Sequence, residues 1–342
     1  MANLSTFTVY VSCISRRLLL AGAFFILSNT CEGAPAASCT PAITAAGEAV
    51  FNARSLSKDG KVNCATCHDP QHAFTDGKAK AVGVFGKTGT RNTPSLLGIA
   101  DDPAFFWDGR RSTLADVVLD PFTNPVELGL DSVTELEARI AGDETVRTRL
   151  ESAFDGGRQK TTLERVRASL VCYVRSLSEN AQASATTTSP MTPQAERGKK
   201  LFIGLAGCSE CHRVENGRYS DSKYHHSGVE QAEITSRLDT LSRIVAESTL
   251  SADKLGPQVL ADAEWSALGR FVVTHQPIDI GAFLTPSLRN VAATAPYMHD
   301  GSIRSLREAV DREIYYRAFS TGRTTNLSQD ERDALVAFLE TL

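Results

Sequence analysis

Two pentapeptides, CATCH at residues 64–68 and CSECH at residues 208–212, constrain the fold of this chain more than any other feature. In each, two cysteines separated by two residues are followed at once by a histidine, which is the pattern of covalent c-type haem attachment. A redox disulfide or half of a zinc site also uses C-x-x-C, but neither accounts for a histidine after both motifs. We therefore expect two c-type haems. The cysteines that would form the thioether bonds are Cys64, Cys67, Cys208 and Cys211, and the proximal iron ligands are His68 and His212.

Residues 1–36 form a segment apart from the fold. Arg16 and Arg17 precede the apolar run LLLAGAFFIL, and small residues follow as far as Ala36. This order is typical of a secretory signal peptide that is cleaved near Ala36, and the apolar run is too short to predict a transmembrane helix. We expect export to the periplasm, an oxidising compartment, without a stable membrane anchor. A lipid anchor on Cys31 is the lesser alternative.

Two further cysteines, Cys39 and Cys172, lie outside the signal peptide and the haem motifs. An exported protein rarely keeps two free thiols, because its compartment oxidises them. We therefore expect a disulfide between Cys39 and Cys172.

The mature chain reads as two tandem helical units. Before each haem motif, a glycine, two further residues and an apolar pair ending in phenylalanine recur, in segments 47–51 and 198–202. The similar stretches LVCYVRSL (residues 170–177) and LVAFLETL (residues 335–342) end the two units as apolar helices. Strand signals are sparse, and the 342 residues are 42% hydrophobic, which suits two domains with sizeable cores. We predict a mostly α fold of two duplicated cytochrome c domains with long loops.

The polar, proline-containing stretch SENAQASATTTSPMTP marks the boundary between the units. We place the first unit at residues 37–180, a linker at residues 181–193 and the second unit at residues 194–342. The second unit contains an insertion, residues 213–284, which is the largest departure from the duplicated plan and a candidate docking surface. Its adjacent histidines in "YHH" are expected to be solvated. The formal net charge of −4 gives no reason to expect nucleic acid as a partner.

Two loops of the chain are near copies, TPSLLGIADDPAFFWDG in the first unit and TPSLRNVAATAPYMHDG in the second. They align without a gap, so that Trp107 falls on His299. Continuing the same alignment brings Pro121 onto Glu313. We expect the two loops to meet near a pseudo-twofold axis between the units, where only one of them needs to supply an aromatic bridge.

The two haem motifs, the stretches RNTPSL, FWDGR and TAPYMHDG, and the pair Pro121 and Glu127 together resemble the bacterial di-haem cytochrome c peroxidases and the related MauG-type enzymes. The resemblance covers nearly the whole mature chain. It implies that the N-terminal haem reacts with hydrogen peroxide, that the C-terminal haem stores or relays electrons, and that Trp107 lies between them as the relay. It also implies a calcium ion between the domains, and the residues that match its protein ligands are Asn92, Thr294 and Pro296.

The first unit is expected to keep one face of its haem open. By resemblance, Pro121 occupies the position that faces the distal side of this haem, and proline has no side-chain atom that can bind iron. Glu127 matches the family's distal acid, which can move a proton from one peroxide oxygen to the other. Val117 replaces a glutamine that the family often has there. His72, the one histidine in the loop after the first motif, lies too close to the proximal histidine to act as a blocking ligand, so we expect no reductive activation.

The second unit departs further from the family pattern. Glu313 occupies the position that supplies methionine to the second haem in the peroxidases and tyrosine in the MauG-type enzymes. The stretch AVDREIYYRAF is expected to be helical, which places Tyr316 on the same face as Glu313, with Tyr315 as a further rival. We expect an oxygen ligand or none for the second iron, and the choice between Glu313 and Tyr316 stays open.

These features favour an exported oxidoreductase that uses hydrogen peroxide. The missing methionine ligand and the missing blocking histidine favour MauG-type oxidation of a partner protein. The first alternative is a reductively activated cytochrome c peroxidase that detoxifies peroxide with electrons from a small redox protein. The second is a di-haem electron-transfer protein without an enzymatic site, against which Pro121 and Glu127 argue.

Overall fold

The computed structural model describes residues 38–154, 161–185, 190–214, 217–229, 234–322 and 324–342. The expected signal peptide and its cleavage site lie outside these residues. Within the described ranges, no helix is both long enough and apolar enough to cross a membrane.

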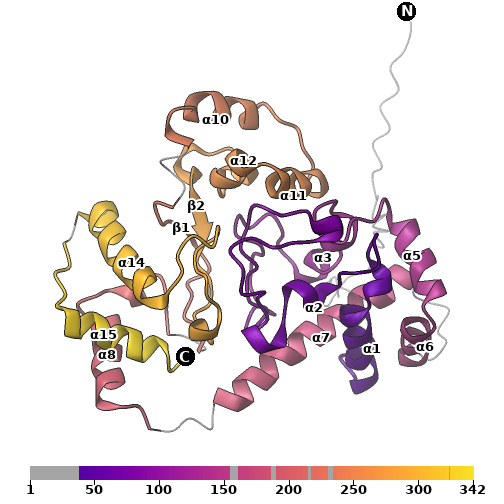
Figure 1. Cartoon of the computed structure of the whole chain (residues 1–342), viewed down its shortest axis with the longest axis horizontal. Helices are drawn as coiled ribbons and strands as arrows, with labels where there is room; N and C mark the ends of the chain where they lie inside the picture. The colour runs from indigo at the N-terminus through magenta and orange to yellow at the C-terminus, as the bar shows by residue number, and fades with distance from the viewer. Residues whose placement is uncertain (1–37, 155–160, 186–189, 215–216, 230–233, 323) are drawn as a thin grey trace, which may run out of the picture. The chain divides into compact units, whose positions relative to one another are not determined.

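The fold is mostly helical, as predicted, with long connecting loops (Figure 1). The helices of the first unit are α1 (Pro41–Asn52), α2 (Cys64–Cys67), α3 (Leu114–Val117), α4 (Asp120–Thr123), α5 (Val133–Gly142), α6 (Glu144–Ala153) and α7 (Thr162–Ala185). Those of the second unit include α8 (Pro193–Ile203), α10 (Leu238–Ala246), α11 (Ala252–Ala261), α12 (Ala263–Ala267), α13 (Phe271–Thr274), α14 (Leu306–Thr321) and α15 (Gln329–Leu339). Two short strands, β1 (Tyr224–His226) and β2 (Ala282–Leu284), pair antiparallel.

In each unit, the helix before the haem motif packs against the closing helix (Figure 1). α1 meets α7 at Gly47, where a Cβ atom would overlap the carbonyl oxygen of Ser169. α8 meets α15 at Gly198, where a Cβ atom would overlap the carbonyl oxygen of Ala334. Only glycine permits so close an approach of two helix backbones. The duplication predicted from the sequence therefore recurs in the packing.

A disulfide joins Cys39 to Cys172, with the two Cα atoms 5.3 Å apart. Cys39 directly precedes α1, which begins where the side chain of Thr40 accepts a hydrogen bond from the Ile43 amide at 3.3 Å. Cys172 lies buried in α7. The bond thus fastens the start of α1 to α7, and it is the pairing that we predicted.

The linker differs from its prediction at one end. α7 continues to Ala185, so the first residues of the predicted linker, 181–185, are helical. The reason is local, because alanine and glutamine in this stretch are good helix formers although they are also common in linkers. α8 then begins after Thr192, whose side chain accepts a hydrogen bond from the Ala195 amide at 3.2 Å. Residues 186–189, between the two helices, lie outside the described residues.

The insertion of the second unit has an apolar cluster of its own and packs against the first unit. Buried members of this cluster include Leu241, Val245, Leu255, Val259, Trp265, Leu268 and Phe271. The hydroxyl of Thr90 in the first unit donates to the carbonyl oxygen of Val259 at 2.7 Å, and Arg111 pairs with Asp253 at 2.5 Å. One side of the insertion, which we expected to offer a docking surface, is therefore occupied by the first unit.

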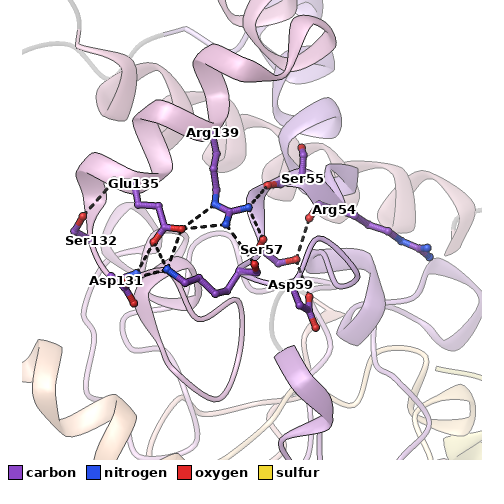
Figure 2. A network of polar contacts seen from close by, with 9 residues as sticks. Arg54, Ser55, Ser57, Asp59, Asp131, Ser132, Glu135 and Arg139 are labelled. Atoms are coloured by element: carbon purple, nitrogen blue, oxygen red, sulfur yellow. Dashed lines mark hydrogen bonds and ion pairs between the residues drawn. The ribbon is translucent and has the colours of Figure 1, made fainter.

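A polar network fixes the chain just before the first haem motif (Figure 2). Arg139 of α5 donates to three backbone carbonyl groups, those of Ser55, Ser57 and Lys58. Glu135, one turn earlier, binds the guanidinium of Arg139 and the ammonium group of Lys58, each at 3.0 Å. The Lys58 amide donates to the carbonyl oxygen of Leu128 at 2.8 Å. The network therefore ties the approach to the first motif to the segment that follows Glu127.

Candidate active site

The first haem motif is built on a short capped helix. The side chain of Asn63 accepts a hydrogen bond from the Thr66 amide at 2.9 Å, and the Thr66 hydroxyl accepts one from the Asn63 amide at 3.0 Å. This reciprocal pair, a capping box, holds the two cysteines of α2 in place. His68 follows, and its Nδ1 lies 3.0 Å from the carbonyl oxygen of Phe74.

The second motif begins with a 3-10 helix, η4 (Cys208–Glu210), that has no side-chain cap, but it repeats the contact of the histidine. Nδ1 of His212 lies 2.8 Å from the carbonyl oxygen of Tyr219. Because Nδ1 donates to a carbonyl oxygen in both units, Nε2 is the nitrogen left unprotonated for a metal. Burial lowers the pKa of both His68 and His212, so both imidazoles are neutral at pH 7. The four motif cysteines are not disulfide-bonded. Each motif thus presents two thiols and a neutral imidazole, the donor set that fits a c-type haem.

The duplicated loops meet at Trp107 and His299. The two rings lie edge to face with their centroids 6.4 Å apart. Nε1 of Trp107 donates to the carbonyl oxygen of Asn92 at 2.9 Å, and the Asn92 amide donates to the carbonyl oxygen of His299 at 2.8 Å. Asn92 therefore connects the two loops, and the structure brings together the pair of aligned positions that the sequence singles out.

The backbones of the two loops also match. Phe106 and Met298, which align in the duplication, both adopt a left-handed conformation, with φ of 65° and 72°. An antiparallel bridge closes each loop, between Phe105 and Arg111 in the first unit and between Tyr297 and Ile303 in the second. Non-glycine residues seldom adopt positive φ, and such conformations concentrate at functional sites. The copied sequence thus encodes a copied and unusual loop shape.

His299 is buried, with 2% of its surface exposed, and its ring stacks on that of Phe283 at 3.5 Å. Burial, with the nearby positive charge of Arg91, holds the pKa of His299 well below its ordinary value. His299 is therefore neutral at physiological pH, and it packs between Phe283 and Trp107 as an uncharged ring.

Asp108, next to Trp107, is fully buried and gathers arginines from three segments. Arg110 binds its carboxylate at 2.9 Å, and a guanidinium nitrogen of Arg91 lies 4.0 Å away. Arg270 of the insertion donates to the backbone oxygens of Asp108 and Gly109 at 2.9 and 2.7 Å. Our sequence reasoning did not assign these residues. The Asp and Arg of FWDGR were the available signal, whereas nothing in the sequence pointed to Arg270.

Pro121 and Glu127 lie in one compact turn that begins within α4. The Leu128 amide donates to the carbonyl oxygen of Pro121 at 3.0 Å, and the Glu127 amide donates to the carbonyl oxygen of Asn124 at 3.0 Å. These two bonds close the turn and fix where the Glu127 side chain begins. The structure therefore brings the two predicted residues of the peroxide site into one segment.

The electrostatic surroundings of Glu127 place its carboxyl group beside the first haem motif. Burial raises the pKa of Glu127 to about 7, Arg110 opposes this rise, and the negative charge of Asp120 adds to it. The pKa values of the two thiols of the first motif, Cys64 and Cys67, are raised as well. Burial is the main cause of this rise, and the negative charge of Glu127 is the second cause. The charge of Glu127 thus acts on both thiols of the haem attachment site, and these three residues are all half-buried.

His72 remains on a surface turn in the first unit. Its Nδ1 lies 2.9 Å from Oδ2 of Asp69, three residues earlier, and its side chain is about half exposed. A histidine held in this turn is consistent with the expectation that it does not block the first haem.

α14 carries the candidates for the sixth ligand of the second haem. Burial raises the pKa of Glu313 to about 6, and the charge of Glu313 in turn contributes to a raised pKa at Cys208, so its carboxyl group lies beside the second motif. Tyr316 instead packs its ring against Gly228, where a Cβ atom would overlap it. Tyr315 is 63% exposed. Glu313 is itself an exposed residue, so the choice between Glu313 and Tyr316 stays open.

The three calcium candidates have the following surroundings. The Asn92 side chain donates from Nδ2 to the carbonyl oxygen of Lys78 at 2.8 Å, which leaves Oδ1 as its possible ligand atom. The Thr294 hydroxyl donates to the carbonyl oxygen of Val291 at 2.9 Å. Pro296 can offer its carbonyl oxygen only. The calcium site stays a prediction.

The adjacent histidines His225 and His226 are exposed, as we expected, and His225 also has polar partners. Nε2 of His225 lies 2.9 Å from Oδ2 of Asp221, and the Cys211 sulfur atom lies within 4.8 Å of ligand atoms of both. A hydrogen bond with Cys211, followed by the one with Asp221, raises the pKa of His225 to about 9. A thioether bond on Cys211 would remove the first partner and leave Asp221. His225 therefore borders the second haem motif, a placement that depends on the β1 and β2 pairing rather than on its neighbours in sequence.

Comparison with known protein families matches both halves of the chain. The family described as di-haem cytochrome c peroxidase matches residues 41–188, and the cytochrome c family matches residues 195–342. The methylamine utilization protein MauG of Methylorubrum extorquens is 31% identical over 315 residues, which cover 89% of this chain and 78% of that protein. The cytochrome-c peroxidase IdrP2 of Denitromonas iodatirespirans is 33% identical over 311 residues, which cover 86% of this chain and 80% of that protein.

Solved structures show the same fold. A MauG-like protein associated with microbial copper homeostasis matches with a TM-score of 0.66 and 25% identity, over 89% of both chains. The di-haem peroxidase BthA of Burkholderia thailandensis matches with a TM-score of 0.63 and 24% identity, over 89% of this chain and 86% of that one. With its two haem motifs and these relatives, the chain belongs to the di-haem cytochrome c peroxidase and MauG family, and it is a peroxidase-type oxidoreductase with two c-type haems.

Proposed function

We propose that this protein is a MauG-type enzyme that uses hydrogen peroxide at its N-terminal haem to oxidise a partner protein. The observation that carries the proposal is the carboxyl group of the half-buried Glu127 near the first motif, with its pKa raised to about 7 chiefly by desolvation. A group that titrates near neutral pH can both take and return a proton. The bound haems would supply the iron-centred redox chemistry, and the chain supplies proton transfer and the contacts between the two units.

Glu127 is suited to move one proton within a peroxide molecule. Its ionised carboxylate takes the proton from one oxygen, and the resulting carboxylic acid gives it to the other, so that a water molecule leaves. The charge of Arg110 favours the ionised form that the first half of this transfer needs, and burial favours the neutral form that the second half needs. Pro121, in the same turn, offers no atom that could bind iron in place of peroxide.

Trp107 is the residue that we propose as the electron relay between the units. Its ring touches that of His299 from the second unit, and its Nε1 donates to a backbone carbonyl group. A carbonyl oxygen does not accept a proton at neutral pH, so the indole would keep its Nε1 proton on losing an electron. The buried arginines on Asp108 hold this loop in one position, which keeps the relay distance constant.

Glu313 supports the MauG-type reading of the second haem. An anionic oxygen ligand lowers the potential of haem iron, whereas the methionine found at this position in the peroxidases raises it. A low potential at the second haem suits a protein that shares oxidising equivalents between its two units. Tyr316 is the alternative ligand of the same chemical class.

The second candidate function is a reductively activated cytochrome c peroxidase that takes electrons from a small redox protein. It is favoured by the relatives, since IdrP2 is a cytochrome-c peroxidase and is 33% identical, close to the 31% of MauG. The surface turn that holds His72 argues against it, because this class needs a histidine that blocks the first iron until reduction. For either function we propose periplasmic location and a calcium ion bound by Asn92, Thr294 and Pro296.

The variant Glu127→Gln tests the proton-transfer role. Glutamine keeps the shape of the side chain but can neither take nor return the proton, so we expect the rate of reaction with hydrogen peroxide to fall by about a hundredfold or more. Haem content and the optical spectrum of the resting protein should not change. Glu144→Gln, at an exposed position of α6, is the matched control. An unchanged rate in Glu127→Gln would show that another group transfers the proton.

A further inference from the structure

Helix α11 of the insertion lies against two neighbouring arginines of the first unit. Asp253 pairs with Arg111 at 2.5 Å. Gly256 faces Arg110, and a Cβ atom at Gly256 would lie 3.3 Å from Nε of that arginine. Residues three apart lie on the same face of a helix. One face of α11 therefore meets both arginines that follow the Trp107 loop.

Arg111 continues from α11 to the segment that carries Pro121. Its guanidinium binds the carboxylate of Asp120 through two bonds, of 2.8 and 2.6 Å. Such a two-point pairing fixes the orientation of both groups as well as their distance. Asp120 is the first residue of α4, and Pro121 comes next. Arg111 thus links Asp253, which is 81% exposed, to the turn that holds Pro121 and Glu127.

Arg110 is held more tightly still. Its side chain is 4% exposed, and its Nη1 binds both carboxylate oxygens of Asp108, at 3.0 and 2.9 Å. The guanidinium lies 3.6 Å from the ring centre of Phe106. Nε of Arg110 has no hydrogen-bonding partner among the described residues, and it faces Gly256 of the insertion, which has no side chain to crowd it. The place of this buried charge therefore depends on α11 as well as on the Trp107 loop.

We infer that Arg110 and Arg111 are positioning residues for the peroxide side of the first haem, and that α11 of the insertion keeps them in place. The inference rests on the proposed function for one point, the roles that it gives to Pro121 and Glu127. The groups that act on Glu127 belong to the same assembly, since Arg110 and Asp120 carry the charges that face it and Asn124 gives it a hydrogen bond. A segment of the second unit thus sets the geometry of the reactive site in the first.

Cyanide binding to the ferric holoprotein tests this inference without requiring turnover. The variants are Asp253→Asn, Arg111→Lys and the two combined, and Asp239→Asn is the matched control, at an exposed acidic residue of α10. We expect the dissociation constant of cyanide at the first haem to change roughly tenfold in each single variant, as loss of outer-shell partners typically does. The electron paramagnetic resonance (EPR) signal of the second haem should not change in any variant. The control Asp239→Asn should bind cyanide with the dissociation constant of the parent.

The combined variant separates positioning from a general loss of stability. If Asp253 acts through Arg111, the double change should have no larger effect on cyanide binding than Arg111→Lys alone. Gly256→Ala gives a second approach, because it removes no charge but adds a Cβ atom 3.3 Å from Nε of Arg110, so cyanide binding should change while both ion pairs of Arg111 remain.

Cyanide binding that is unchanged in Arg111→Lys, Asp253→Asn and Gly256→Ala would overturn the inference. Changed cyanide binding in a protein that does not react with peroxide would instead overturn the proposed function and leave the inference standing.

Discussion

At the residue scale, the two units differ most at one pair of aligned positions. Pro121 and Glu313 are equivalent in the duplicated sequence, but only Glu313 carries an atom that can bind iron. In the structure, the Leu128 amide joins Pro121 to the turn that holds Glu127, and the charge of Glu313 contributes to the raised pKa of Cys208 in the second motif. We therefore predict that this one difference separates an open first haem from a second haem with an oxygen ligand.

The variant Glu313→Met should raise the reduction potential of the second haem, because a thioether ligand favours the ferrous iron more than a carboxylate does. Tyr316→Phe is the matched control and should leave both the potential and the EPR spectrum unchanged. A potentiometric titration followed by optical spectroscopy measures the change. If Tyr316→Phe alters the low-spin signal and Glu313→Met does not, Tyr316 is the ligand.

The residues that the sequence predicted are those whose role is encoded locally. The haem motifs and the copied loops are visible as short patterns, and the contact between Trp107 and His299 follows from their alignment. Asp108, Arg270 and His225 were not predicted, because their roles depend on contacts between segments far apart in the chain. A buried Asp–Arg pair leaves no periodic pattern in a sequence. A loop motif such as FWDGR therefore marks residues with a structural or functional role, but it does not show which residues they contact.

At the scale of elements, the two helix pairs depend on a glycine at each crossing. At Gly198 an added Cβ atom would overlap the backbone of α15, so Gly198→Ala should lower the free energy of unfolding by about 2 kcal/mol, as overpacking of a core does. Gly142→Ala is the control, because Gly142 ends α5 with nothing within 4 Å of its would-be Cβ atom. That variant should be as stable as the parent or more so. Urea unfolding measures both, and equal stability of all three proteins would contradict the close packing.

The network around Arg139 and Glu135 predicts a dependence of stability on pH (Figure 2). A hydrogen bond from the Asp131 amide, and then the Lys58 ammonium group, lower the pKa of Glu135 from 4.5 to about 2. A lowered pKa means that the ionised carboxylate stabilises the folded protein above pH 4.5, and that this contribution is lost as the pH falls toward 2. The difference in free energy of unfolding between the parent and Glu135→Gln should therefore shrink over that range. A constant difference would mean that the network does not stabilise the fold through this charge.

At the scale of the whole molecule, two long-range connections hold the fold together, one between the two units and one within the first unit. The insertion, which the sequence marked only as a departure from the duplicated plan, packs against the first unit through Thr90 and Arg111. Its length was visible in the sequence, but its contacts were not, since its helices bury their own apolar cluster as any small domain would. The second connection, the disulfide, was predictable from the count of cysteines.

Removing the disulfide with the double variant Cys39→Ala and Cys172→Ala should lower the free energy of unfolding by about 3 kcal/mol, because the bond closes a loop with a sequence separation of 133 residues. Reduction of the parent protein should produce a similar loss. Urea unfolding under oxidising and reducing conditions measures both. A parent protein whose stability does not respond to reduction would show that the bond does not constrain the chain in solution.

The most direct test of a first haem that is open without reduction is to add hydrogen peroxide to the purified diferric protein in the absence of any reductant. Optical and EPR spectra are recorded within seconds. We predict rapid loss of the ferric signals of both haems, including the low-spin one, because the open first haem would share its oxidising equivalents with the second through Trp107. Spectra that stay unchanged until the second haem is reduced would contradict this account, and the protein would then be a reductively activated peroxidase.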